Sequence, residues 1–148
     1  MERTVAAIRK GTVIDHIDKG QGLRLALHLK LAERGCPVTV GLNLESASMG
    51  RKDLIKFEGG PLTPKELTII SLFAPRATIS TIDAYKVIDK VSVSMPKQVV
   101  GTLVCYNRSC VTRAEPIETH FFVGLERGMV VLQCRHCESS FARDVVYG

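Results

Sequence analysis

Two short cysteine pairs decide the fold of the last third of this sequence: Cys105-Tyr106-Asn107-Arg108-Ser109-Cys110 and Cys134-Arg135-His136-Cys137. Four residues separate the cysteines of the first pair, two separate those of the second, and 23 lie between the pairs. Two such pairs on two turns supply four sulfur ligands for a tetrahedral Zn²⁺ ion. Because a domain of about 50 residues buries little core, we expect it to fold around this metal.

The alternative is a set of four structural or redox thiols without metal. His136 lies inside the second pair, but four thiolates already fill the zinc shell. A filled shell favours one structural ion per chain, since a catalytic zinc keeps an open position. The fifth cysteine, Cys36, stands alone before Pro37 and is expected to be a small, partly buried side chain.

The charge distribution argues against nucleic-acid binding by the cysteine domain. Residues 1–98 hold 15 Lys/Arg against 10 Asp/Glu, whereas residues 99–148 hold 5 of each. Four thiolates around one Zn²⁺ add a formal charge of about −2. Nucleic-acid affinity comes mainly from Lys and Arg on phosphates, so a protein partner is the more plausible target.

Upstream, apolar patterns predict a mixed α+β domain. The segment Leu23–Leu31 alternates leucine like a strand, but it lacks β-branched residues and is interpreted as a helix. A second helix begins at Thr63-Pro64 with a Thr-x-x-Glu capping box to Glu66. Leu67, Ile70 and Ala74 mark one face of this helix, and Pro75 ends it. Expected strands are Thr4–Ile8, Thr12–Ile17, Val38–Leu44, Asp53–Phe57, Thr78–Ile82 and Tyr85–Val91, with a loop over Glu45–Lys52.

This order predicts an antiparallel sheet with two helices on one face, followed by a small all-β domain. The predicted boundaries are residues 1–92 for the first domain, 93–98 for a linker and 99–148 for the cysteine domain. Short strands are expected there at Val99–Cys105, Thr119–Leu125, Met129–Cys134 and Phe141–Val146.

Several function classes find no support in the sequence. No apolar run approaches the roughly 18–20 residues that cross a bilayer, and no secretory leader is visible. We therefore expect a cytoplasmic protein without a membrane partner. No Walker loop or Ser/His/Asp or Cys/His grouping at recognisable spacing is found, which favours a non-catalytic chain.

Four polar residues of the first domain have the chemistry to meet an anionic ligand: Asp15, His16, Lys56 and Lys90. Lysine offers a point charge to phosphates, and histidine and aspartate hydrogen-bond to ribose or phosphate oxygens. From spacing alone this grouping is weak, and solvated surface lysines are the simpler interpretation.

Longer motifs resemble the regulatory chains of aspartate carbamoyltransferase. They are Lys10–Ile17, Gly41–Leu44, Met49–Lys56, Ala74–Thr78, Ala114–Pro116 and the cysteine pattern with Glu138 after it. The resemblance covers nearly the whole chain in order. It implies a ferredoxin-like nucleotide domain and a zinc domain, in a holoenzyme where regulatory homodimers bridge catalytic trimers of pyrimidine biosynthesis. It also implies inhibition by CTP, with UTP adding to it, and activation by ATP.

The resemblance further implies roles for matching positions. Base and ribose would meet Val5, Ala7, Ile8, Asp15 and Lys56, the triphosphate would meet His16 and Lys90, and the pocket would be lined by Leu54, Ser80, Ile82, Tyr85 and Val87. Asn107, Arg135 and Glu138 match positions near the catalytic-chain interface. The sequence departs from the family pattern at Ala6, Ser80, Ser92 and Ser109.

Two other functions stay open from the residues alone. A zinc-ribbon nucleic-acid-binding protein would show DNA or RNA affinity that falls steeply with salt. A small nucleotide-converting enzyme would turn over CTP or ATP by itself.

Overall fold

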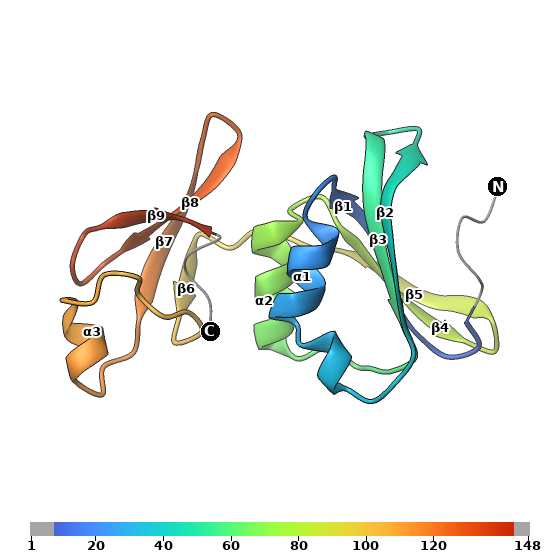
Figure 1. Cartoon of the computed structure of the whole chain (residues 1–148), viewed down its shortest axis with the longest axis horizontal. Coiled ribbons are helices and arrows are strands. Elements are labelled where there is room, and N and C mark those ends of the chain that lie inside the picture. Colours follow the sequence, from blue (N-terminus) through green and yellow to red (C-terminus); the bar gives the residue numbers. More distant parts are fainter. Residues whose placement is uncertain (1–7, 144–148) are drawn as a thin grey trace. The chain divides into compact units, whose positions relative to one another are not determined.

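The computed structural model describes residues 8–143 and divides the chain into two compact units, Met1–Ser94 and Met95–Gly148. Each unit builds its own antiparallel sheet (Figure 1). The first contains β1 (Gly11–Asp18), α1 (Gly22–His28), the 3₁₀ turn η1 (Leu31–Glu33), β2 (Val38–Ser46), β3 (Gly50–Phe57), α2 (Pro64–Phe73), β4 (Thr78–Asp83) and β5 (Lys86–Ser92). The second contains β6 (Gln98–Val100), α3 (Val111–Ala114), β7 (His120–Glu126), β8 (Met129–Cys134) and β9 (Ser140–Ala142).

The five-stranded sheet has the order β2-β3-β1-β4-β5, and every neighbouring pair is antiparallel. Strands and helices follow a β-α-β-β-α-β order with β5 added at the edge, which confirms the ferredoxin-like prediction. Both helices lie on the same face of the sheet (Figure 1). The core between these layers contains Ile14, Ile55, Phe57 and Ile70, all fully buried.

Helix α2 begins as the sequence predicts. The Thr63 hydroxyl accepts a hydrogen bond from the Glu66 N–H, and the Glu66 carboxylate accepts one from the Thr63 N–H. Of the helical face expected from Leu67, Ile70 and Ala74, Ile70 and Ala74 are fully buried, but Leu67 is 38% exposed. The helix instead buries the run Ile69–Phe73, because its last turns are covered on more than one side.

The loop expected over Glu45–Lys52 is largely strand. Strand β2 continues to Ser46 and β3 already begins at Gly50, so three residues form the turn. Gly50 has a φ of +74°, which suits glycine, and the Met49 N–H donates to the Ser46 hydroxyl at 3.2 Å. Cross-strand pairing therefore overrides the local turn composition.

The second unit is a meander in the order β6-β7-β8-β9 around Phe121 and Leu132, both fully buried. Strand β6 is shorter than expected and ends before Gly101, whose φ is +73°. The four-residue helix α3 was not expected from the sequence. Strand β9 ends at Ala142, and residues 144–146 of the last expected strand lie outside the described residues.

Candidate functional site

The four cysteine sulfurs of the second unit meet at one point. All four Sγ atoms lie within 4.8 Å of one another, and Cys105–Cys137 and Cys110–Cys134 are each separated by 3.7 Å. Disulfides would need sulfur separations of about 2.05 Å, and all four thiols are free. A tetrahedron with metal–sulfur bonds of about 2.3 Å has edges near 3.8 Å. The donor set therefore fits one tetrahedral metal ion.

Two turns hold the cysteine pairs. In the first, the Cys110 N–H donates to the Asn107 carbonyl at 3.0 Å, and Cys110 then caps α3. In the second, the Glu138 N–H donates to the Cys134 carbonyl at 2.8 Å, and Glu138 takes a φ of +62°. The turn at the end of β8 thus directs Cys134 and Cys137 towards the first pair.

The protein environment acts unequally on these thiols. Burial raises the pKa of Cys105 to about 12 and also raises the pKa of Cys134. Burial acts in the same direction on Cys137, but hydrogen bonds from Ser139 and from the Asn107 side chain lower its pKa to about 6. Because a metal ion binds thiolates, it must displace the protons of the buried sulfurs.

The three residues expected at a protein interface lie on these cysteine turns. Asn107 is half-buried between Cys105 and Cys110, whereas Arg135 and Glu138 are exposed beside the second pair. The Arg135 N–H donates to the His120 carbonyl at 2.8 Å, which fixes the backbone of that turn to β7. The three side chains therefore depend on the same turns that the sulfurs stabilise.

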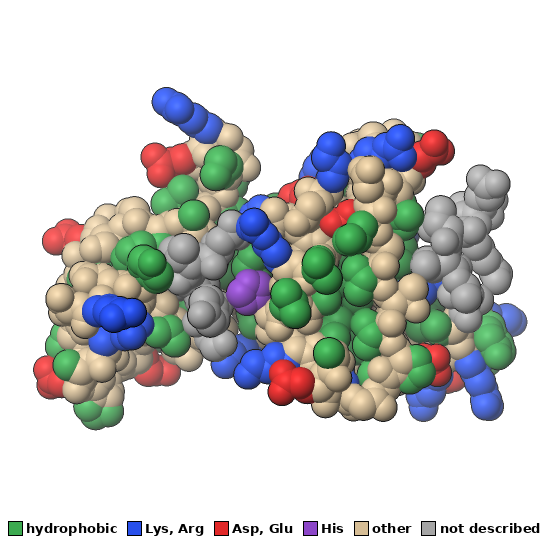
Figure 2. Space-filling view, in the orientation of Figure 1, with side chains coloured by type: hydrophobic (Ala, Val, Ile, Leu, Met, Phe, Trp, Pro, Cys, Tyr) green, Lys and Arg blue, Asp and Glu red, His purple; other side chains and the backbone are tan. Residues whose placement is uncertain are grey.

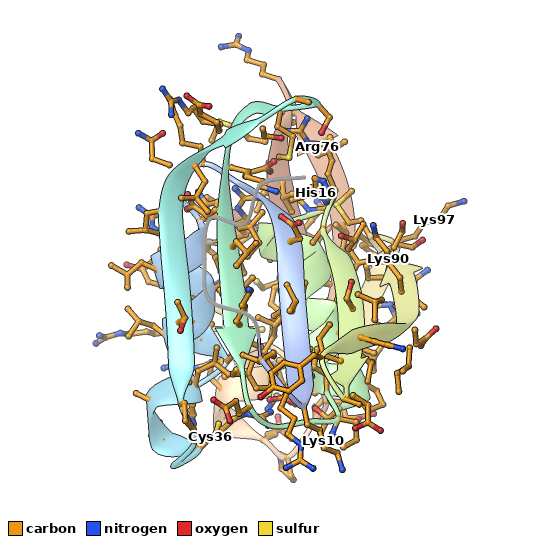
Figure 3. All side chains as sticks on the ribbon, turned by 90° about the vertical axis from the view of Figure 1, so that its right-hand side faces the viewer. Lys10, His16, Cys36, Arg76, Lys90 and Lys97 are labelled. Carbon is orange, nitrogen blue, oxygen red and sulfur yellow. The ribbon has the colours of Figure 1, made fainter. Side chains whose placement is uncertain are left out.

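A row of directly paired residues crosses the sheet of the first unit. Lys56 on β3 pairs with Val13 on β1, Val13 pairs with Ser80 on β4, and Ser80 pairs with Lys90 on β5. The next row holds the core residues Ile14, Ile55 and Ile79. Since paired residues share a face and successive residues alternate, Lys56 and Lys90 face away from the helices. Figure 3 looks onto this face, with Lys90 and His16 labelled in its upper half.

A β-bulge brings Asp15 and His16 onto this face together. Ile14 pairs with Ile55 and Ile17 with Asp53, so β1 carries one extra residue opposite β3. His16 takes a φ of +59°, and its Nδ1 lies 3.1 Å from the Thr78 hydroxyl. Asp15 forms an ion pair of 2.9 Å with Lys52. The three-residue spacing of the buried Ile14 and Ile17 is the sequence signal for this bulge.

The other sequence-predicted residues that the structure describes lie on β3, β4 and β5, in the β4–β5 turn and just before β1. Leu54 and Ile82 are buried, and Ile82 pairs with the exposed Val87. Tyr85 is 64% exposed in the β4–β5 turn, where its N–H donates to the Arg9 carbonyl at 3.0 Å. Ile8, the residue before Arg9, is half-buried. Val5 and Ala7 lie outside the described residues.

Sequence reasoning missed Asp53, which is fully buried on the helix side of the sheet. Its Oδ2 accepts hydrogen bonds from the N–H groups of Gly20 and Gly22, at 3.0 and 2.8 Å. Its Oδ1 accepts one from the Asn43 N–H at 2.8 Å, at a second bulge in β2. Asp53 thereby connects the start of α1 to β2 and to β3, the strand that carries Leu54 and Lys56.

No helix within residues 8–143 is long and apolar enough to cross a membrane.

Comparisons with known proteins agree along the chain. Residues 3–94 match a family model described as aspartate carbamoyltransferase regulatory chain, allosteric domain, and residues 97–147 match the metal binding domain of the same chain. A regulatory chain from Cronobacter sakazakii is 46% identical over 142 residues, which cover 96% of this chain and 93% of that protein. One from Chromobacterium violaceum is 43% identical over 144 residues, covering 97% and 95%. One from Klebsiella pneumoniae is 44% identical over 142 residues, covering 96% and 93%.

Proposed function

This chain belongs to the family of aspartate carbamoyltransferase regulatory chains, which are non-catalytic subunits that act with a catalytic chain. We propose that it regulates the activity of that partner by binding CTP or ATP. CTP inhibits, with UTP adding to the inhibition, and ATP activates at the same site. The controlled reaction belongs to pyrimidine biosynthesis.

The observation that carries the nucleotide proposal is the row Lys56–Val13–Ser80–Lys90 across the open face of the sheet. Three strand spacings of about 4.8 Å separate the backbones of the two lysines by about 14 Å. Two ammonium groups therefore flank the surface of β1 and β4, where an elongated anion would lie across the strands. Lysine is well suited to phosphate groups as a point charge.

The bulge residues complete this proposed site. His16 is beside Thr78, and Asp15 offers a carboxylate to ribose hydroxyls while Lys52 balances its charge. Leu54, Ile82 and Val87 supply apolar surface, and the Tyr85 turn contacts the segment at Arg9. Val5, Ala7 and Ile8 are assigned to the base by the family resemblance.

The metal is proposed to be zinc, one structural ion per chain. Four thiolates in a tetrahedron suit Zn²⁺, and the full sulfur shell leaves no position for a substrate. The five free cysteines also fit a reducing compartment, and we assign the chain to the cytoplasm on that basis.

Two protein contacts belong to the proposal. The cysteine turns present Asn107, Arg135 and Glu138 to the catalytic chain. A second copy of the chain covers the exposed leucines of α1 and β2. Figure 2 shows hydrophobic side chains grouped on the face of the first unit that α1 and β2 present to the viewer in Figure 1. Leu23 and Leu27 are 56% and 69% exposed, and Leu42 is 50% exposed. Large apolar side chains grouped in this way favour a protein contact.

Nucleotides of opposite effect must bind two states of the assembly unequally, because equal affinity shifts no equilibrium. We propose that the triphosphate attracts Lys56 on β3 and Lys90 on β5 at the same time and shifts these strands. The cysteine turns then transmit the shift to the catalytic chain. A coupling free energy of about 1–3 kcal/mol is typical of such systems.

The test is reconstitution of the zinc-loaded chain with its catalytic subunit. CTP should lower and ATP raise activity at subsaturating substrate, and Lys90→Ala should weaken both nucleotides by about tenfold, a loss near 1.4 kcal/mol. Lys65→Ala, an exposed lysine on α2, is the matched control. Unchanged activity with either nucleotide, despite assembly, would refute the proposed function.

A further inference from the structure

The cysteine sulfurs accept hydrogen bonds from residues that no motif assigns to metal binding. The Thr112 hydroxyl on α3 lies 3.1 Å from Cys110 Sγ. The Ser139 hydroxyl and the Asn107 side chain hydrogen-bond to Cys137. A thiolate has no proton to give, so in the metal-bound state each of these side chains must be the donor.

The donors differ in kind from one sulfur to the next. Cys105 accepts from the backbone N–H of Asn107, and Cys134 accepts from the backbone N–H groups of His136 and Cys137. These bonds come with the turns themselves. The contacts to Cys110 and Cys137 use side chains, so a substitution can remove them while every ligand stays in place.

Local structure fixes two of the three side chains. The Asn107 Oδ1 accepts from the Ser109 N–H at 3.0 Å, which leaves its amide group to donate. Helix α3 holds Thr112 one position before Arg113, whose guanidinium donates to the Cys105 carbonyl at 2.8 Å. Helix α3 therefore contacts both cysteines of the first pair, Cys110 through Thr112 and Cys105 through Arg113.

The location of these donors matters for metal release. Four thiolates and a divalent ion leave a net charge of about −2, which is costly in a partly buried site without hydrogen bonds. Cys105, Cys110 and Cys134 are buried, whereas Cys137 is half-buried. Water or a competing chelator therefore reaches the Cys137 sulfur most easily, where both Ser139 and Asn107 donate.

We propose that Thr112, Ser139 and Asn107 are positioning residues that set the lifetime of the bound metal ion, with Ser139 and Asn107 retarding release at the Cys137 side. This inference rests on the proposed zinc binding of the four cysteines. Donors to ligand atoms fix the orientation of the ligands and compensate their charge, and their removal typically costs about 10–100-fold in affinity.

The experiment loads the full-length chain with zinc and follows transfer of the ion to a colorimetric chelator. Thr112→Val, Ser139→Ala and Asn107→Ala should each release zinc about tenfold faster than the unmodified chain. The conservative variants Thr112→Ser and Ser139→Thr retain a hydroxyl and should restore the slow rate to within about twofold. Ser140→Ala, an exposed neighbour on β9, is the control and should leave the rate unchanged.

Cobalt substitution separates this role from a general loss of structure. Each variant should still show the sulfur-to-cobalt absorption bands of a four-thiolate site. Release rates within about twofold of the unmodified chain for all three variants would overturn the inference. Equal acceleration in Ser140→Ala, or failure of both conservative variants to restore the rate, would also overturn it. If mass spectrometry shows that the unmodified chain binds no zinc, the proposed metal function fails as well.

Discussion

Replacing Asp53 by asparagine should destabilise the first unit by about 3 kcal/mol, although the change alters a single atom. The Asp53 carboxylate is fully buried and accepts three backbone hydrogen bonds. Two reach Oδ2 from the turn that begins α1, and the third reaches Oδ1 from Asn43.

The magnitude follows from the donors that asparagine would face. Its amide has one acceptor oxygen and one NH₂ group. If the oxygen keeps Gly20 and Gly22, the NH₂ group meets the Asn43 N–H, and two donors face each other. A hydrogen bond to a charged group contributes about 1.5–3 kcal/mol, and an unsatisfied buried donor costs about 1–3 kcal/mol. Part of this cost is relieved by movement of the β2 bulge, so about 3 kcal/mol is expected.

Thermal unfolding of the zinc-loaded chain, followed by calorimetry, measures this loss. For a unit of this size, 1 kcal/mol corresponds to about 4–8 °C, so the midpoint should fall by about 12 °C or more. Asp89→Asn, at an exposed position of β5, should leave the midpoint unchanged. If Asp53→Asn melts within about 3 °C of the unmodified chain, the hydrogen-bond argument is wrong.

Thr63→Ala should lower the free energy of unfolding in urea by about 1 kcal/mol, since it removes the α2 cap; an unchanged midpoint would contradict this. Burial would raise the pKa of Glu66, but hydrogen bonds from Thr63 and the Arg34 ion pair hold it below 4.5. The stabilisation is therefore present above pH 4.5 and lost as the pH falls through the lowered pKa, so Arg34→Met should destabilise at neutral pH and have a diminishing effect in acid. Zinc removal by a chelator, or Cys134→Ser, should unfold the second unit while the amide signals of the first persist in NMR spectra.

Features set by neighbouring residues could be predicted from the sequence. The capping box of α2 involves Thr63 and Glu66, three residues apart, so the pattern contains the whole interaction. The helix near Leu23–Leu31 was identified from residue type against a misleading alternation of leucines, and α1 occupies Gly22–His28. The cysteine spacing likewise indicated a metal site, because each pair forms its own turn.

Features that depend on pairing across the sheet could not be predicted in this way. The expected loop at Glu45–Lys52 becomes strand because β2 and β3 pair with each other there. The contact of Thr112 with Cys110 depends on α3, a helix too short to show a hydrophobic period. Asp53 appeared only as the first residue of an expected strand, and its three donors come from segments up to 33 residues away.

The two bulges explain how the sheet keeps large apolar residues on its core face and polar residues on its open face. If the residues of β1 alternated strictly after Ile14, Ile17 would fall on the face of Val13 and expose a large apolar side chain. The bulge returns Ile17 to the core and leaves Asp15 and His16 together outside. The β2 bulge at Asn43 lies against the same Asp53 carboxylate that binds the α1 turn. The Asp53 carboxylate therefore holds the β2 bulge and the α1 turn, and the Asp53 backbone pairs with Ile17 at the end of the β1 bulge. Substitutions at Asp53 should for this reason alter nucleotide binding at Asp15 and His16 as well as stability.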